Sequence, residues 1–201
     1  MKKKVYVTLQ NGTVFQGYRF GAEGEITGEL VFSTGMVGYV ETLTDPSNYG
    51  QIVVQTFPLI GNYGVNESDA ESEKAWVSAY IVRENCDEPS NFRSEGTLDA
   101  YLKKQGVIGV YGVDTRELTK ILREEGTMNA MICDEVPATL DGINAYRVTD
   151  VVAAVSAKES AVGSMSSATR TGDFEVNICD INFCFCSTVC HIYVSNVPLV
   201  T

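Results

Sequence analysis

The residue types best suited to chemistry gather near the C-terminal end of this chain. They are three cysteines and the only histidine: Cys184, Cys186, Cys190 and His191. Thiolate sulfur and imidazole nitrogen are ligands that zinc prefers, but structural zinc sites usually pair two ligand knuckles across a longer span, and this cluster has no second knuckle. Buried apolar thiols in a strand-like segment, or a tail that does not fold, account for the same residues. We therefore expect no metal site in this chain.

A nucleophilic cysteine is the second possibility for the same cluster. A reactive thiolate needs a base that the fold places beside it, and it is commonly lifted out of its strand by a Gly-x-Cys-x-Gly elbow. No such elbow occurs in the sequence. Neighbouring residues of a strand point to opposite faces, so His191 would not face Cys190. The sequence accordingly predicts no catalytic residue.

A glycine-rich loop, Ser33–Gly38, follows a strand-like run. A nucleotide-binding loop would need a Lys-Ser/Thr pair or a G-x-G-x-x-G pattern, and neither is present. Gly35 and Gly38 are explained by tight turns, because glycine adopts without strain the backbone conformations that such turns require.

The run Asp45–Asn48 favours a turn, because Asp can accept a hydrogen bond from the backbone two residues on and Pro fixes φ. Such a turn would display the Ser47 hydroxyl and the neighbouring amides to a small polar ligand or to a partner domain. A purely structural turn explains the same residue types. From the residues alone, both interpretations stay open.

These loops and turns are expected to lie between short strands and two helices. Alternating or β-branched runs predict strands at 5–9, 14–20, 29–32, 51–57, 75–83, 107–110 and 128–133. The dipeptide Asn11-Gly12 between the first two predicts a hairpin. Helices are predicted at 97–106 and 114–126, each with a capping residue at its start and a glycine at its end. The pattern indicates a mixed α+β unit that ends near residue 150.

Composition and charge exclude several classes of protein. The 201 residues are 44% hydrophobic and 20% charged, which is the composition of a folded domain. The formal net charge is −11, so the surface repels nucleic-acid phosphates and anionic membranes. The N-terminal lysines precede a strand-like run instead of the apolar core of an export signal, which predicts a cytoplasmic protein with reduced thiols. The uncharged run 181–201 holds too many polar residues for a membrane span.

An ordered series of short motifs covers most of residues 1–135. The motifs are the runs 28–39, 41–47, 50–53, 57–66, 90–93, 114–119 and 122–126. Together they resemble the small subunit of carbamoyl-phosphate synthetase. The resemblance implies an α+β fold in three parts: the layered β/β/α N-terminal domain of that subunit over 1–150, a linker over 151–172, and a truncated or degenerate start of a class I glutamine amidotransferase domain over 173–201.

The resemblance also implies a function. In that family the small subunit hydrolyses glutamine and passes the ammonia to a large subunit, which uses ATP, Mg and bicarbonate to make carbamoyl phosphate for pyrimidine and arginine biosynthesis. The family therefore implies a large-subunit partner and no cofactor in this chain. It further implies that Ser47 binds glutamine in the full-length subunit.

The family's catalytic cysteine, histidine and glutamate have no counterpart in this sequence, so we expect that the chain alone does not hydrolyse glutamine. The likeness ends after Asp180, which predicts a truncation or a frameshift; an intact reading frame downstream would contradict this. Two alternatives stay open. One is a non-catalytic docking or regulatory module, and the other is an inactive gene fragment.

Overall fold

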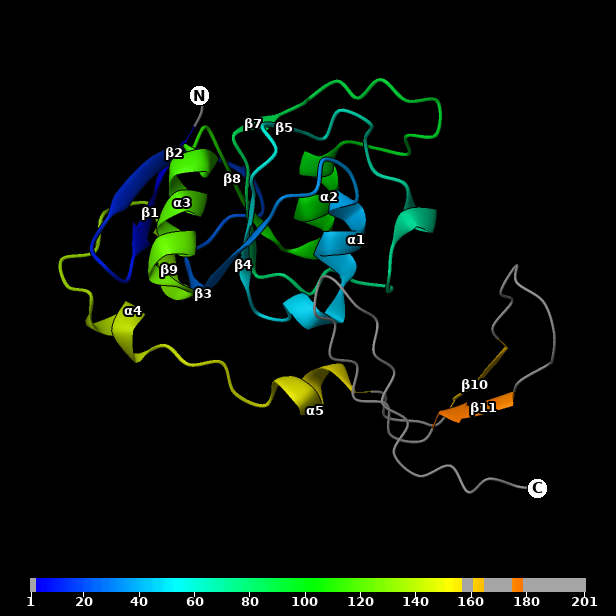
Figure 1. Cartoon of the computed structure of the whole chain (residues 1–201). Helices are drawn as coiled ribbons and strands as arrows, with labels where there is room; N and C mark the ends of the chain where they lie inside the picture. Colours follow the sequence, from blue (N-terminus) through cyan, green and yellow to red (C-terminus); the bar gives the residue numbers. More distant parts are fainter. Residues whose placement is uncertain (1–2, 157–160, 165–174, 179–201) are drawn as a thin grey trace. The chain divides into compact units, whose positions relative to one another are not determined.

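The computed structural model describes residues 3–156, 161–164 and 175–178 (Figure 1). Contacts between residues divide the chain into two compact units, Met1–Thr149 and Asp150–Thr201. The sequence-based hypotheses about Cys184, Cys186, Cys190 and His191 lie outside the described residues.

Seven strands of the first unit close into a barrel, in the order β1-β2-β8-β6-β4-β3-β9. Their bounds are β1 Lys4–Leu9, β2 Val14–Gly21, β3 Ile26–Ser33, β4 Ile52–Gln55, β6 Ala79–Ile81, β8 Ile108–Tyr111 and β9 Met128–Cys133. The neighbours β3–β4, β4–β6 and β6–β8 run parallel, whereas β1–β2, β2–β8, β1–β9 and β3–β9 run antiparallel. One part of the barrel wall is therefore a parallel sheet and the other part is antiparallel.

Helices and short elements surround this barrel. The helices are α1 Tyr39–Thr44, α2 Leu98–Gln105, α3 Thr115–Glu125 and α4 Asp141–Ala145, with single 3-10 turns η1 Pro46–Asn48 and η2 Glu67–Asp69. Two further strands, β5 Leu59–Ile60 and β7 Glu84–Asn85, pair with each other in parallel. Figure 1 shows α1 and α2 side by side on one side of β4, and α3 on the other side.

The parallel strands are buried on both faces, which separates two hydrophobic clusters. In β4, Ile52 and Val54 belong to the cluster that also includes side chains of β1, β9 and α3, whereas Val53 belongs to the cluster formed with α1 and α2. In β6, Ala79 and Tyr80 divide in the same way. Side chains alternate between the faces of a strand, so a continuous apolar run fills both clusters.

The ends of the predicted elements are confirmed where the signal is local. Gly12, with φ of 87°, lies in the turn between the antiparallel strands β1 and β2. The Thr97 side chain caps α2 by accepting a hydrogen bond from Ala100 N at 3.2 Å. The Asp114 side chain caps α3 by accepting one from Glu117 N, also at 3.2 Å.

Two parts of the first unit differ from the sequence-based expectations. The strand predicted at 75–83 is shorter, because Trp76 N donates to Leu43 O at 2.9 Å and so bonds to α1 instead of to a strand. Helix α1 was not predicted, and it is the helix that leads into the Ser47 turn. The α+β class itself is confirmed by the mixed sheet and its helices.

The second unit contains three described elements. They are α5 Val151–Val155, β10 Ala161–Ser164 and β11 Glu175–Ile178, and the two strands pair antiparallel. Helix α5 and strand β10 thus fall within the predicted linker 151–172, and β11 falls within the segment interpreted as the start of an amidotransferase domain. In the part of the chain that the structure describes, no helix is long and apolar enough to cross a membrane.

Candidate functional site

The turn that carries Ser47 is held by its own backbone and by Asp45. The Asp45 carboxylate accepts a hydrogen bond from Ser47 N at 2.8 Å, as the sequence predicts. Asn48 N donates to Asp45 O and Tyr49 N donates to Pro46 O, each at 3.1 Å. The expectation that the neighbouring amides face a ligand is therefore wrong, because the turn itself uses them. The half-buried Ser47 hydroxyl forms no hydrogen bond with any described residue.

The C-terminal end of α1 fixes the position of this turn. Thr44 is fully buried, and its hydroxyl accepts a hydrogen bond from Glu71 N at 2.9 Å. Its carbonyl oxygen accepts one from the Ser72 hydroxyl at 2.6 Å. From within the turn, the Asn48 side chain donates to Thr42 O at 2.9 Å. The Ser47 turn is thus bonded to α1, and the C-terminal end of α1 is bonded to the loop that precedes β6.

The N-terminal end of α1 is held by two tyrosines. Gly38 has φ of 83° and provides no side-chain cap. The Tyr63 hydroxyl instead accepts hydrogen bonds from Gly38 N at 2.8 Å and from Tyr39 N at 3.3 Å. The Tyr39 ring stacks on the Tyr63 ring with centroids 4.2 Å apart, and its hydroxyl donates to Gly64 O. Burial raises the pKa of both phenols above its ordinary value, so the neutral form of each is favoured further.

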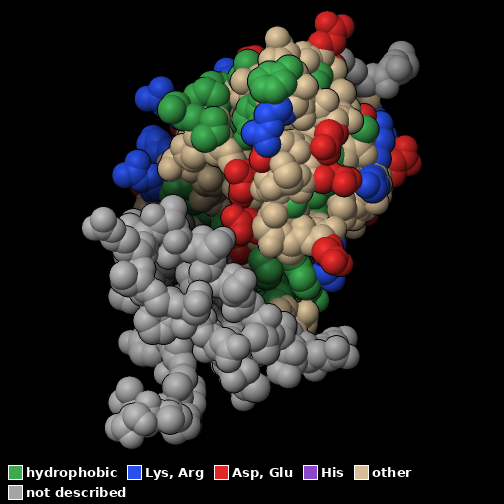
Figure 2. All heavy atoms as spheres, turned by 90° about the vertical axis from the view of Figure 1, so that its right-hand side faces the viewer, with side chains coloured by type: hydrophobic (Ala, Val, Ile, Leu, Met, Phe, Trp, Pro, Cys, Tyr) green, Lys and Arg blue, Asp and Glu red, His purple; other side chains and the backbone are tan. Residues whose placement is uncertain are grey.

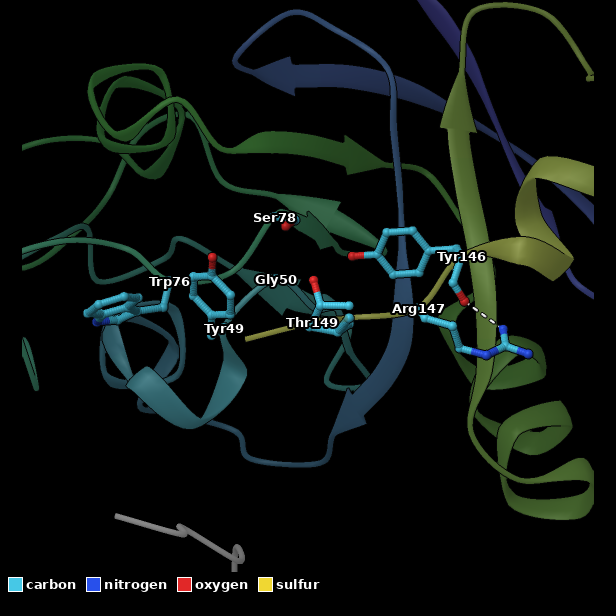
Figure 3. Close-up of a pocket in the computed structure, with 8 residues that line it drawn as sticks. Tyr49, Gly50, Trp76, Ser78, Tyr146, Arg147 and Thr149 are labelled. Carbon is cyan, nitrogen blue, oxygen red and sulfur yellow. Dashed lines mark hydrogen bonds between the residues drawn. The ribbon is translucent and has the colours of Figure 1, made fainter. Parts of the chain in front are cut away.

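A cavity of about 330 Å³ adjoins the Ser47 turn (Figure 3). Its lining residues are Tyr49, Gly50, Trp76, Ser78, Tyr146, Arg147, Val148 and Thr149. The Tyr49 and Trp76 rings meet edge to face with centroids 5.8 Å apart, and Lys74 Nζ lies 3.9 Å from the centroid of the Trp76 ring. The volume is in the range of small-molecule sites.

The cavity is lined by hydroxyl groups. Figure 3 shows the Tyr146 hydroxyl turned toward Ser78, and the Arg147 side chain directed away from the cavity. The Arg147 guanidinium donates to Asn144 O at 2.9 Å and to Tyr146 O at 2.6 Å. Burial, followed by the nearby carboxylate of Glu29, raises the pKa of Tyr146. The site therefore offers neutral hydrogen-bonding groups to a polar ligand.

The described residues around the turn supply positioning groups but no nucleophile paired with a base. Cys86 and Cys133 are free thiols, and burial raises the pKa of the Cys133 thiol, which disfavours the reactive thiolate. Among the described residues, no group of three or more His, Cys, Asp or Glu side chains could hold a metal ion. The arrangement can orient a ligand through Ser47.

The sequence predicted the Asp45 cap of the Ser47 turn, but it did not indicate the groups that hold α1 and this turn in place. The hydrogen bonds of Tyr63 with Gly38 and of Thr44 with Glu71 join residues about 25 positions apart in the sequence. No local pattern indicates either bond. Gly35 and Gly38 were expected at tight turns; Gly38 has the positive φ of such a turn and begins α1.

The family model and the curated relatives agree on one family. The family model for the carbamoyl-phosphate synthase small chain, CPSase domain, matches residues 7–132. The carbamoyl phosphate synthase small chain of Clostridium perfringens (strain 13 / Type A) is 50% identical over 159 residues, which cover 78% of this chain and 46% of the relative. That of Bacillus caldolyticus is 53% identical over 130 residues, covering 65% and 36%, and that of Aquifex aeolicus (strain VF5) is 52% identical over 132 residues, covering 66% and 36%.

A solved structure, an aminopeptidase from Aneurinibacillus sp. strain AM-1, covers 66% of the chain with a TM-score of 0.40 and 17% identity, a likeness too low to define a shared fold.

The barrel and its helices form the domain that this family model matches. The chain belongs to the carbamoyl-phosphate synthase small chain family, and the matched residues 7–132 are the CPSase domain of that family. The chain spans about a third to under half the length of the curated relatives reported above.

Proposed function

We propose that this chain is the part of a glutamine-dependent carbamoyl-phosphate synthetase small subunit that docks on the large subunit and contributes Ser47 to the glutamine site. The family match supports the assignment to that enzyme. The observation that carries the role of Ser47 is its hydroxyl, which forms no hydrogen bond with a described residue, on a turn whose backbone amides at Ser47, Asn48 and Tyr49 are all bonded. Glutamine would supply the ammonia for carbamoyl phosphate, for pyrimidine and arginine biosynthesis.

The chemistry of Ser47 suits binding and orientation. A serine hydroxyl donates one hydrogen bond and accepts others, so it can contact the carboxylate, the ammonium or the amide of glutamine. Hydrolysis of the amide requires a thiolate, its base and an oxyanion hole, which the family supplies from its amidotransferase domain. In this proposal ATP and Mg bind to the large subunit, and the chain itself holds no cofactor.

We also propose that the first unit is built from three layers. The parallel strands β3, β4, β6 and β8 and the antiparallel strands β1, β2 and β9 correspond to two β layers around one hydrophobic cluster. Helices α1 and α2 add a third layer over the second cluster. This arrangement supports a layered β/β/α domain over 1–150. The proposal adds, from the family resemblance alone, a linker over 151–172 and the start of an amidotransferase domain over 173–201. The free thiols of Cys86 and Cys133 fit a reducing, cytoplasmic location.

A chimera tests the role of Ser47. Residues 1–149 would replace the corresponding part of the Clostridium perfringens small chain, and the glutaminase activity would be measured with the large chain present. We expect Ser47→Ala to raise KM for glutamine about 10-fold, the effect of one lost hydrogen bond to substrate, with a smaller change in kcat.

Ser68→Ala is the matched control, because Ser68 lies in a second 3-10 turn, η2. Its backbone N donates to Asn66 Oδ1 at 3.1 Å, just as Ser47 N donates to Asp45. An unchanged KM in the Ser47→Ala chimera would contradict the glutamine role. For the chain by itself we expect no glutamate release from glutamine, and release that survives replacement of all six cysteines would overturn this part of the proposal.

A further inference from the structure

Four large hydrophobic side chains are exposed on three neighbouring segments of the first unit, 33–41, 59–64 and 84–92. They are Met36, Val37, Leu59 and Phe92, with exposed fractions of 65%, 72%, 39% and 97%. We call these four side chains the upper apolar surface. Figure 2, which turns the right-hand side of Figure 1 toward the viewer, shows hydrophobic side chains gathered on the upper part of that face, with basic side chains beside them and several acidic side chains below.

The three segments are bonded to one another. The Gln55 side chain donates to Gly35 O, which ties the first segment to the end of β4. The Tyr63 hydroxyl accepts from Gly38 N at 2.8 Å, and Tyr63 O accepts from the Asn91 side chain at 3.4 Å. Strands β5 and β7 join the second and third segments directly. The upper apolar surface is therefore preorganised, which lowers the entropy lost when a partner binds.

The charge on these segments has one sign. They carry four carboxylates and neither lysine nor arginine: Glu41, Glu84, Asp87 and Glu88. None of the four forms an ion pair with a described residue, whereas the flanking Arg83 and Arg93 are paired with Asp114 at 3.5 Å and Asp69 at 3.6 Å. A surface that joins exposed apolar groups to unpaired carboxylates is complementary to an apolar patch with lysine or arginine at its edge.

We propose that the upper apolar surface is the docking site for the large subunit, an inference that rests on the function proposed above. The partner surface has apolar side chains at its centre, where Phe92 and Met36 bind, and basic side chains at its rim. An anionic membrane and a nucleic acid do not fit, because the four carboxylates repel both.

Binding of the full 201-residue chain to the large chain of the Clostridium perfringens synthase tests the assignment. The variant Met36→Asp/Val37→Asp is expected to raise Kd at least about 30-fold, as is usual when central apolar contacts of an interface are lost. Phe92→Ala is expected to raise Kd by a similar factor. Glu84→Lys/Glu88→Lys is expected to weaken binding and to reduce its dependence on salt.

Val136→Asp is the matched control, because Val136 is an exposed hydrophobic residue, at 49%, that follows β9 and lies outside the three segments. Its Kd should stay within about twofold of the unchanged chain, and far-UV circular dichroism should show that every variant is folded. If the unchanged chain binds and all variants bind equally well, the surface assignment is wrong while the docking function stands. If the unchanged chain does not bind the large chain, the docking function itself is wrong.

Discussion

At the scale of single residues, the hydroxyl groups of the candidate site differ in whether the fold already bonds them. The hydroxyls of Tyr63 and Thr44 bond only to backbone groups, one at each end of α1. Ser47 is the group of the turn whose hydroxyl has no described partner. A hydroxyl held on a rigid turn loses little entropy when a ligand binds, which suits the ligand contact proposed for Ser47.

The Tyr39 phenol gives a pH-dependent prediction. Burial, followed by the neighbouring Tyr63, raises the pKa of Tyr39 above its ordinary value near 10. The folded chain then holds this proton more tightly than the unfolded chain, so the stabilisation is complete below about pH 10 and is lost as the pH rises further. We expect the free energy of unfolding to fall above about pH 10, and Tyr39→Phe to reduce that slope by up to about 1.4 kcal/mol per pH unit. Urea unfolding between pH 8 and pH 11 measures this; equal slopes would contradict it.

At the scale of elements, the free backbone groups at a helix end can be hydrogen-bonded by neighbouring residues or by residues far away in the sequence. Helix α2 is capped by adjacent residues: Thr97 is its N-cap, and Gly106, with φ of 72°, is its C-cap. Helix α1 begins at Gly38 without a side-chain cap, and its first amides are held by Tyr63. The stability of α1 therefore depends on tertiary contacts, whereas the ends of α2 are determined by its own sequence.

The end of α2 provides a clean test of backbone strain. A Cβ added at Gly106 would meet no atom within 4 Å, so the cost of Gly106→Ala comes only from its positive φ. We expect a loss of about 1 kcal/mol in the free energy of unfolding by urea. The control is Gly142→Ala within α4, where space is equally open and φ is not positive, so alanine is expected to stabilise by about 0.5 kcal/mol. A change of the same sign in both variants would be inconsistent with this explanation.

The distinction between local and long-range interactions also explains which elements the sequence could predict. Helices α2 and α3, the β1–β2 hairpin and the Asp45 cap were predicted because residues within a few positions determine them. Helix α1, the parallel pairings and the cavity beside Ser47 were not, because they join segments far apart in the chain. The part played by Tyr146 in the cavity, about 100 residues from Tyr49, has no local signal at all. The family resemblance added Ser47 as a glutamine contact, which stays a prediction.

At the scale of the whole first unit, the two hydrophobic clusters are not independent. They share the strands β4 and β6, whose successive side chains enter alternate clusters. Losing one cluster would expose one face of the strands that the other cluster needs. A domain built in this way is expected to unfold as one cooperative unit.

Adjacent residues of β4 test this coupling. Val53 belongs to the cluster formed with α1 and α2, and Val54 belongs to the cluster inside the barrel. We expect Val53→Ala and Val54→Ala each to cost about 1–3 kcal/mol, because each leaves a cavity in a buried cluster. One probe is the fluorescence of Trp76, the only tryptophan, and the other is amide exchange in β1, whose Val7 faces the barrel interior. If the clusters are coupled, each variant lowers the free energy of unfolding by the same amount whether it is measured by fluorescence or by amide exchange. A Val53→Ala variant that changes the fluorescence transition and leaves exchange in β1 unaltered would show that the clusters unfold separately.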